Sequence, residues 1–188
     1  MHFAWRALAW MRRLVALRHD RMVYVTRGRP EMSQSAICIS AEDPRQADIR
    51  RIIAESDAMM QAHYPAESNH LVDADELAAA DAVFLVARRD GEALGSIAYR
   101  LIAPGHAEMK RLFVRDNARG MGLGRHLLEA LEDAARRQGI ARISLETGVK
   151  QGEAISLYRA SGYQDWLPFA SYQHDPLSLF MTKPLVEA

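Results

Sequence analysis

The sequence predicts an α/β fold in which helices cover both faces of one central, mixed sheet. Strand-like and helix-like segments alternate from residue 37 to residue 183. The segment at residues 82–89 begins with six apolar residues, which is typical of a strand that is buried on both faces. With 188 residues, the chain is long enough for one domain with a substantial core.

Cap and turn residues set the expected elements before residue 105. Asp43 and Pro44 offer an N-cap and a first-turn proline, so we expect a helix to start there and to end by Pro65. The Asp90-Gly91 pair is a strong hairpin signal between two strands. The expected elements are a strand at 37–41, a helix through Ile49, Ile52, Ile53 and Met60, a short helix capped by Asp73 and reaching Leu77, a strand at 82–89 and a returning strand at 94–101.

Glycines set the expected elements after residue 105. The Pro104-Gly105 pair breaks the chain before the next strand, and Gly139 and Gly162 each end a helix. A stripe of leucines with helical spacing lies between the first two breaks. The expected elements are a strand at 108–114, a helix from about 123 to Gly139, a strand at 143–147, a helix at 152–160 and a last strand at 178–183.

The composition is that of an ordinary globular protein, with 49% hydrophobic and 26% charged residues. The formal net charge is zero, so nothing in the chain as a whole favours nucleic acid as a partner. The single cysteine, Cys38, excludes an internal disulfide and fits a reducing compartment, so we expect a cytoplasmic protein. No apolar run approaches the ~20 residues that a membrane-spanning helix needs.

Charge divides the chain into a basic N-terminal extension, residues 1–35, and a domain, residues 36–188. Residues 1–31 hold seven arginines against two acids, a net charge of +5, and the remainder carries a net charge of −5. Three interpretations of the extension stay open. It is a segment without function before a domain start near Met32, an amphipathic helix that binds a surface or a partner, or a targeting presequence, since no acid precedes Asp20.

A glycine-rich turn at residues 119–125 joins the strand at 108–114 to the helix that follows. The N–H groups of such a turn, together with the positive end of the helix dipole, form a phosphate site. Gly120, Gly122 and Gly124 leave room for a phosphate to reach the main chain. We therefore expect a phosphorylated cofactor. The alternative is a turn that serves only the packing of strand against helix.

The spacing of the glycines separates three kinds of phosphate motif. A P-loop needs lysine after its last glycine, and here Arg125 follows Gly124. In a dinucleotide fingerprint the third glycine would fall on Arg125 or Leu127. The pattern R-x-x-G-x-G, spelled by Arg119, Gly122 and Gly124, does fit. This segment resembles the acyl-CoA loop of the GCN5-related N-acetyltransferases, the GNAT superfamily.

A second segment, residues 151–163, resembles the N-x-x-A-x-x-L-Y-x-x-x-G-F segment of the same superfamily. The residues in register are Ala154, Leu157, Tyr158, Gly162 and Tyr163. One departure is Gln151, which stands where the superfamily has asparagine. The resemblance extends over most of residues 37–185 and implies the GNAT fold, with a mixed, mostly antiparallel central sheet and helices on both faces.

The resemblance implies acetyl-CoA as the acyl donor. Its pyrophosphate would lie on the glycine turn, and its pantetheine arm would pair with the main chain of the preceding strand like an added strand. The residues expected to bind the cofactor are Leu112, Phe113, Val114, Arg119, Gly120, Met121, Gly122, Leu123, Gly124, Arg125 and Gln151.

Acetyl transfer to an amine needs a neutral nucleophile and a stabilised thiolate. An ammonium with a pKa of about 10.4 is neutral only about once in ~10³ molecules at pH 7, so a proton acceptor helps. The resemblance implies Glu108 as that base, through a water, and Tyr158 as the donor to the departing sulfur. Two alternatives stay open: a structural ion pair of Glu108 with Lys110 or Arg111, and a Tyr158 that is packed in the core.

The acceptor is expected to be a primary amine of a small molecule or peptide. Loops 64–76 and 164–177 would line its site and contribute Glu67, Asp73, Asp75, Asp165 and Asp175. These acids would favour a cationic amine, although surface loops are often acidic for solubility alone. His70 would contact the acceptor or simply be exposed. Superfamily members often form homodimers, so the resemblance leaves a homodimer open, and nothing in this chain identifies an interface.

The histidines show no metal-ligand spacing, so no metal site is expected. Within residues 36–188 they are His63, His70, His106, His126 and His174. The sequence thus predicts an N-acetyltransferase. The alternatives are a non-catalytic module that senses acyl-CoA and an enzyme that uses nicotinamide or a nucleotide.

Overall fold

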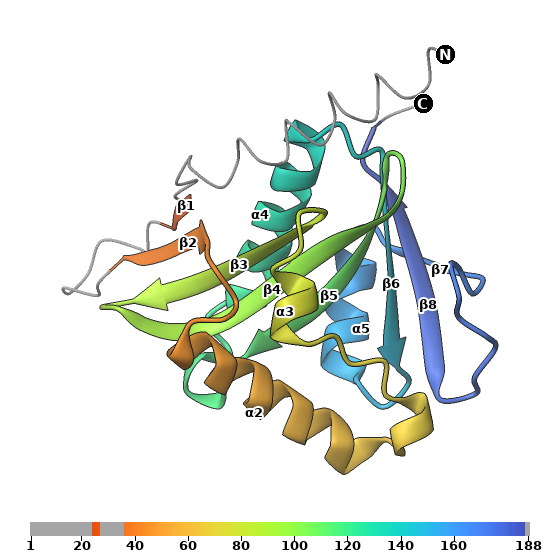
Figure 1. Cartoon of the computed structure of the whole chain (residues 1–188), viewed down its shortest axis with the longest axis horizontal. Helices are drawn as coiled ribbons and strands as arrows, with labels where there is room; N and C mark the ends of the chain where they lie inside the picture. Colours follow the sequence, from red (N-terminus) through yellow and green to blue (C-terminus); the bar gives the residue numbers. More distant parts are fainter. Residues whose placement is uncertain (1–23, 27–35, 187–188) are drawn as a thin grey trace.

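The computed structural model describes residues 24–26 and 36–186 and contains one eight-stranded sheet with helices on both faces (Figure 1). The strands are β1 (Tyr24–Thr26), β2 (Ile37–Ala41), β3 (Ala82–Arg89), β4 (Glu92–Ala103), β5 (His106–Val114), β6 (Arg142–Gly148), β7 (Gln164–Trp166) and β8 (Ser178–Pro184). The α-helices are α2 (Ala47–His63), α3 (Ala74–Leu77), α4 (Leu123–Arg137) and α5 (Gly152–Ala160), with 3-10 turns at Ala66–Ser68 and Asp116–Ala118.

The sheet is mixed and mostly antiparallel, as predicted. Its strand order is β1-β2-β3-β4-β5-β6-β8-β7. Among the described strands, β5 and β6 form the one parallel pair, and every other pair of neighbours is antiparallel. The connection between the two parallel strands carries α4, as a crossover between parallel strands requires.

Two apolar layers, one on each face of the sheet, hold the helices in place. On one face, α2 and α3 pack with Ile49, Ile52 and Leu77 against the sheet. On the other face, α4 and α5 pack against a larger cluster. Strand β3 contributes to both layers, since Phe84 and Val86 face α2 whereas Val83, Leu85 and Ala87 face the other way. This alternation explains why residues 82–87 are all apolar.

The predicted start of the first helix is wrong by three residues. Helix α2 begins at Ala47, and Gln46 is its N-cap. The Asp43 carboxylate instead accepts hydrogen bonds from the main-chain N–H (3.0 Å) and the guanidinium (2.9 and 2.7 Å) of Arg45. The Asp43 carboxylate therefore stabilises a local turn and does not cap the helix.

Two short strands were not predicted. Strand β7 lies in a segment that we expected to be a loop, and its three residues are exposed at the edge of the sheet. Strand β1 lies within the basic extension and pairs with β2, with Tyr24 opposite Ile39. The remaining expectations for residues 1–31 concern positions outside the described residues.

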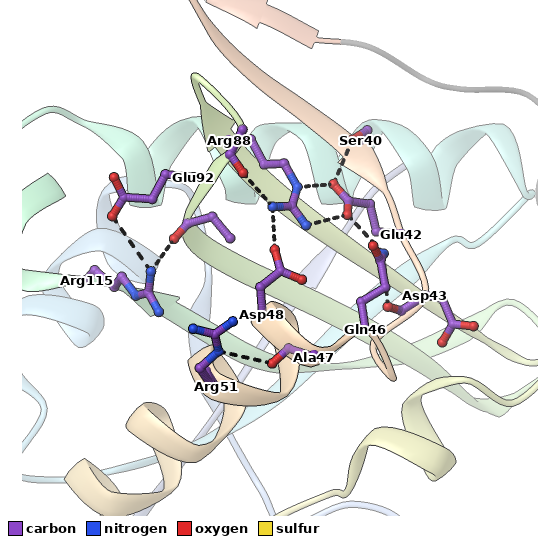
Figure 2. A network of polar contacts seen from close by, with 12 residues as sticks. Ser40, Glu42, Asp43, Gln46, Ala47, Asp48, Arg51, Arg88, Glu92 and Arg115 are labelled. Atoms are coloured by element: carbon purple, nitrogen blue, oxygen red, sulfur yellow. Dashed lines mark hydrogen bonds and ion pairs between the residues drawn. The ribbon is translucent and has the colours of Figure 1, made fainter.

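A network of ion pairs fastens the beginning of α2 to the strands (Figure 2). Arg88 on β3 donates from Nε and Nη2 to Glu42, both at 2.8 Å, and from Nη1 to Asp48 at 2.6 Å. Arg115, directly after β5, donates to Glu55 on α2 at 2.7 and 2.8 Å. These contacts hold α2 beside the C-terminal end of β5, where the glycine turn begins.

Gly148, at the end of β6, has no space for a side chain. A Cβ atom there would lie 2.1 Å from the ring of Tyr64, whose hydroxyl accepts a hydrogen bond from the N–H of Lys150 at 2.8 Å. We expect Gly148→Ala to lower the free energy of unfolding by about 1–3 kcal/mol, because the buried ring must move. Urea denaturation would measure this change.

Gly152→Ala is the matched control for this substitution. Nothing lies within 4 Å of a Cβ at Gly152, which begins α5 in ordinary helical conformation. Its free energy of unfolding should therefore stay equal or rise by up to about 1 kcal/mol. Equal stability of the two variants would contradict the close contact with Tyr64.

Candidate active site

A β-bulge in β5 shapes the centre of the molecule. Ser96 of β4 lies opposite Phe113 and Ala98 lies opposite Lys110, so β5 carries one extra residue between these pairs. Arg111, within the bulge, has a φ of +59°. Its carbonyl accepts a hydrogen bond from the Ser96 hydroxyl at 3.2 Å. The bulge is thus held from the neighbouring strand.

Strands β5 and β6 separate at the bulge. Their pairing runs from His106, opposite Arg142, to Met109, opposite Leu145, and ends there although both strands continue. Figure 1 shows the two strands diverging, with α5 behind the opening. Beyond Met109, the main-chain N–H and C=O groups on the side of β5 away from β4 therefore have no partner in β6 and can pair with a bound molecule.

A cavity, which we call the strand cavity, occupies the opening between β5 and β6. It is closed on one side by α2 and on another by α5. Its lining residues are Ser56, Met59, Met60, His70, Leu71, Val72, Met109, Lys110, Arg111, Leu112, Glu146, Thr147, Gln151 and Tyr158. The structure thus brings together Leu112, Gln151 and Tyr158, which come from distant parts of the chain.

Tyr158 has its hydroxyl free within the strand cavity. The residue is 6% exposed, and its hydroxyl forms no hydrogen bond with any described residue. Burial, with a smaller contribution from the charge of Glu146, raises the pKa of Tyr158 well above its ordinary value of 10.0. The phenol is therefore protonated at neutral pH and can donate a hydrogen bond. Gln151 also points into this cavity and contacts the sulfur of Met60.

The glycine turn lies between the end of β5 and the first turn of α4. Gly120 and Gly122 have φ values of +75° and +74°, a conformation that favours glycine. Gly122 is the N-cap of α4, and among the described residues the N–H groups from Gly120 to Gly124 find no hydrogen-bond partner of normal geometry. The turn therefore presents a row of free donors at a helix N-terminus, as an anion site requires.

Gly124 has a different role from the other two glycines. It has helical conformation, and a Cβ there would lie 3.2 Å from Leu157 of α5. The absence of a side chain lets α4 and α5 approach each other beside Val114. The two motif segments thus touch, which their sequence patterns alone did not show.

The side chains around the turn divide into a buried and an exposed group. Leu123 is 1% exposed and belongs to the core, whereas Met121 is 37% exposed. Arg119 pairs with Asp116 at 3.1 Å. Arg125 is exposed and pairs with no described residue, so its charge is available to a bound anion. Phe113 packs in the apolar layer under α2 and is not among the residues that line the strand cavity.

Glu108 is completely buried and lies among cations. Its Oε2 accepts a hydrogen bond from Nε of Arg100 at 2.8 Å, and its Oε1 lies 3.0 Å from Nζ of Lys110. Tyr172, from the loop between β7 and β8, also donates to Oε1. Lys110 is thus one of the two partners that we considered for a structural pair, whereas Arg111 binds Asp57 and the carbonyl of Val72 instead.

The surroundings of Glu108 keep it ionised. Burial alone would raise the pKa of this carboxyl, but the charge of Lys110 and the hydrogen bonds from Tyr172, Lys110 and Arg100 outweigh burial. The pKa of Glu108 therefore lies below its ordinary value of 4.5. Conversely, burial and the neighbouring Glu108 carboxylate raise the pKa of Tyr172. The assignment of Glu108 as a general base stays a prediction.

Tyr172 is the central residue that sequence reasoning missed. Its hydroxyl contacts both Glu108 and Lys110, and its ring packs edge-on against His70 at 4.8 Å between centroids. It lies 64 residues from Glu108, in a loop without regular pattern. The one sequence signal was the pair of aromatic residues, Phe169 and Tyr172, in a loop that we expected to line the acceptor site.

A second cavity, the loop cavity, has a volume of about 560 Å³ and lies between the two loops expected to line the acceptor site. Its lining residues are Glu67, His70, Leu71, Val72, Glu76, Arg100, Lys110, Ser171, Tyr172, Gln173, His174, Asp175 and Pro176. Of the acids we named, Glu67 and Asp175 line it, whereas Asp73, Asp75 and Asp165 do not. His70, Leu71, Val72 and Lys110 line both cavities, so the two are neighbours.

The part of the chain that the structure describes contains neither a candidate metal site nor a candidate membrane-spanning helix. No group of three or more His, Cys, Asp or Glu side chains there could hold a metal ion. Within residues 24–26 and 36–186, no helix has both the length and the apolar character that crossing a bilayer requires.

Comparison with known proteins gives a consistent result. The model of a family described as the acetyltransferase (GNAT) family matches residues 48–163. An IAA acetyltransferase of Azospirillum brasilense is 48% identical over 150 residues, which cover 79% of this chain and 98% of that protein. The YsnE protein of Bacillus subtilis, an uncharacterized N-acetyltransferase, is 32% identical over 64% of this chain and 82% of its own length.

Solved structures share the fold. A Klebsiella pneumoniae protein proposed to be an acyl-CoA N-acyltransferase is 38% identical, with a TM-score of 0.69 over 80% of this chain and 98% of that one. The PaiA N-acetyltransferase of Thermoplasma acidophilum, solved in complex with coenzyme A, is 21% identical, with a TM-score of 0.64 over 81% of this chain and 99% of that one.

The buried ion cluster makes a prediction for stability. Glu108→Gln should lower the free energy of unfolding at pH 7 by about 3 kcal/mol, because it leaves Lys110 without its buried counter-charge. Since the folded-state pKa of Glu108 lies below the unfolded value of about 4.5, its contribution is present above that value and is lost as the pH falls through the folded pKa. Denaturant titrations at pH 7 and at successively lower pH would measure both effects.

The exposed Glu129 of α4 provides the control, because Glu129→Gln should change stability by less than about 0.5 kcal/mol. If the two variants were equally stable at pH 7, Glu108 would not hold the cluster together.

Proposed function

The chain belongs to the acetyltransferase (GNAT) family and is an N-acetyltransferase that uses acetyl-CoA, and on that premise we propose that it acetylates a primary amine of a small molecule bound in the loop cavity. The observation that carries this proposal is the contact between the two cavities at His70 and Lys110. A donor in the strand cavity and an acceptor in the loop cavity would meet there. The volume of about 560 Å³ is in the range of small-molecule sites.

The donor is proposed to lie along the separated part of β5. Its pyrophosphate would accept hydrogen bonds from the free N–H groups between Gly120 and Gly124, with Arg125 as a further cation. Its pantetheine amides would pair with the main chain of Leu112, Phe113 and Val114. The bound cofactor of the Thermoplasma neighbour supports this use of the fold. The side chain of Gln151 would contact the thioester end of the arm.

Tyr158 is proposed to assist the leaving group. The neutral amine nitrogen attacks the thioester carbonyl carbon and a C–N bond forms. The nitrogen releases one proton to solvent, and the C–S bond breaks as the thiolate departs. The free hydroxyl of Tyr158 lines the strand cavity and is protonated at neutral pH, so it can donate a hydrogen bond or its proton to the sulfur. No described group competes for this hydroxyl.

Glu108 is proposed to act indirectly, by positioning its neighbours, and not as the base that accepts the proton of the amine. Both of its oxygens already accept hydrogen bonds, it is fully buried, and its lowered pKa makes it a weak base near neutral pH. Its charge instead holds Lys110, Arg100 and Tyr172 at the wall of the loop cavity. The cation Lys110 beside the amine would favour the neutral, reactive form of that amine.

The place of action is proposed to be the cytoplasm, in keeping with the single, unpaired Cys38.

A peptide acceptor, in place of a small molecule, would need an open groove, and the loop cavity is bounded on both sides by loops. The homodimer that the resemblance leaves open stays a prediction.

Tyr158→Phe tests the proposed role of the hydroxyl. We expect kcat for acetyl transfer to fall about 10²-fold, because the departing thiolate loses its donor, while the affinity for CoA stays unchanged. Thiol release from acetyl-CoA with a panel of amines gives kcat, and titration calorimetry gives the affinity for CoA. Tyr163→Phe is the matched control, since Tyr163 is a neighbouring buried tyrosine outside both cavities and should keep full activity.

Two outcomes would count against the proposal. Unchanged kcat in Tyr158→Phe would remove this hydroxyl from the mechanism. Binding of CoA without acetylation of any amine would favour the alternative of a sensor module, and stabilisation by NAD or ATP but not by CoA would favour a different class of enzyme.

The pH dependence of the wild-type enzyme tests the role of Glu108. Since the pKa of Glu108 is lowered from 4.5, we expect no ionisation of this carboxyl near neutral pH. kcat/KM should instead rise with pH toward the pKa of the acceptor amine, so two acceptors whose amines differ in pKa should give profiles displaced by that difference. A rise at the same pH for both acceptors would reveal a base on the protein and contradict the indirect role.

A further inference from the structure

A cluster of charged residues at the wall of the loop cavity carries one positive charge in excess. The cations Arg100 and Lys110 and the anion Glu108 form a single cluster, with contacts of 2.8 Å and 3.0 Å to the carboxylate. Two cations and one anion leave one positive charge. Glu108 is fully buried behind the other two side chains, whereas Arg100 and Lys110 both line the cavity. A molecule in the cavity therefore meets the cations and not the carboxylate.

The excess charge resides on Arg100, because Lys110 has no donor left. The ammonium of Lys110 lies within reach of Glu108, of the hydroxyl of Tyr172 and of the carbonyl of His70. Arg100 uses only its Nε–H, toward Glu108. Among the described residues, its Nη1 and Nη2 groups have no hydrogen-bond partner, and its side chain is 36% exposed. This edge of a guanidinium has the shape and charge to bind a carboxylate through two parallel hydrogen bonds.

Among the described residues, the acids that line the cavity, Glu67, Glu76 and Asp175, form no hydrogen bond or ion pair with Arg100 and leave its free edge open to a ligand. Glu76 accepts the N–H of Asp73 at 3.1 Å as part of a helix cap. Asp175 accepts the N–H of Leu177 at 2.8 Å within its own turn. Their charges nevertheless disfavour a second anionic group on the ligand. Together, the free edge of Arg100 and the acidic rim suit a molecule with one carboxylate and one amine.

We propose that the acceptor is such an amino-acid-like molecule and that Arg100 binds its carboxylate; this inference rests on the proposed function. The sheet register sets the spacing. Arg100 lies opposite Glu108, and Lys110 follows two residues later on the same face of β5. Diagonal neighbours of this kind begin about 7–8 Å apart, so an amine beside Lys110 would lie a few bonds from the carboxylate.

Matched pairs of acceptors test this inference on the 188-residue chain. Each pair consists of an amino acid and its carboxamide, such as glycine and glycinamide, β-alanine and β-alaninamide, and methionine and methioninamide. We expect kcat/KM, expressed per neutral amine, to be at least about tenfold higher for the acid in the best pair. The amide has the same skeleton but offers Arg100 no charge.

Arg100→Gln is the decisive variant. Glutamine can still donate to Glu108 but offers no charged fork, so the ratio of acid to amide should fall to about one. A merely structural role of Arg100 would lower the turnover of both acceptors and leave their ratio unchanged. Arg51→Gln, at an exposed arginine of α2 outside both cavities, is the control and should keep the wild-type ratio.

A binding measurement extends the test beyond turnover. A carboxylic acid that lacks the amine, such as propionate for β-alanine, should inhibit the wild-type enzyme in competition with the acceptor and should lose this effect in Arg100→Gln. Equal use of acids and amides by the wild type, or an unchanged ratio in Arg100→Gln, would overturn the inference while leaving acetyl transfer itself intact. Failure to acetylate any amine would instead refute the proposed function, and this inference with it.

Discussion

The extra residue in β5 is the constraint on which the rest of the site depends. It holds Arg111 in a left-handed conformation that costs about 1 kcal/mol or more for a residue with a side chain, and the contacts of Ser96, Val72 and Asp57 offset that cost. At the same point β5 leaves β6, with which it is paired only as far as Met109. The separation supplies both the opening that forms the strand cavity and the unpaired main chain beside it. A regular strand would have continued the ladder and closed the opening.

The elements around this opening are each fixed by a different force. Helix α2 is held by the apolar layer beneath it and by the ion pairs of Arg88 and Arg115. Helix α4 is held by its leucine stripe, so its N-terminus, with the glycine turn, lies at the end of β5. Gly124 allows α5 to pack against α4, and this contact places Tyr158 in the cavity wall.

Buried charge organises the acceptor side. Removing a carboxylate from water is unfavourable, and Glu108 is stable in the interior because Arg100, Lys110 and Tyr172 all donate to it. The cluster also joins four parts of the chain, since β4, β5 and the loop between β7 and β8 meet there and Lys110 reaches the carbonyl of His70. The cluster thus fixes the walls of the loop cavity before any ligand binds. It also orients the guanidinium edge of Arg100 toward the cavity.

Contiguous residues determined much of this protein. The order of the elements, the glycine turn at a helix N-terminus and the segment around Tyr158 follow from local spacing, because hydrogen bonds and dipoles in turns and helices join residues that are close in sequence. The tertiary structure alone decided what joins distant residues. Asp43 turned to Arg45 rather than capping a helix, Phe113 faced the core, and Glu108 found partners on a neighbouring strand and on a loop 64 residues away. The contacts of Phe113 and Glu108 depend on which strands pair and in which register, and neither is contained in any local pattern of residues, whereas the Asp43–Arg45 contact is local and competes with the expected helix cap.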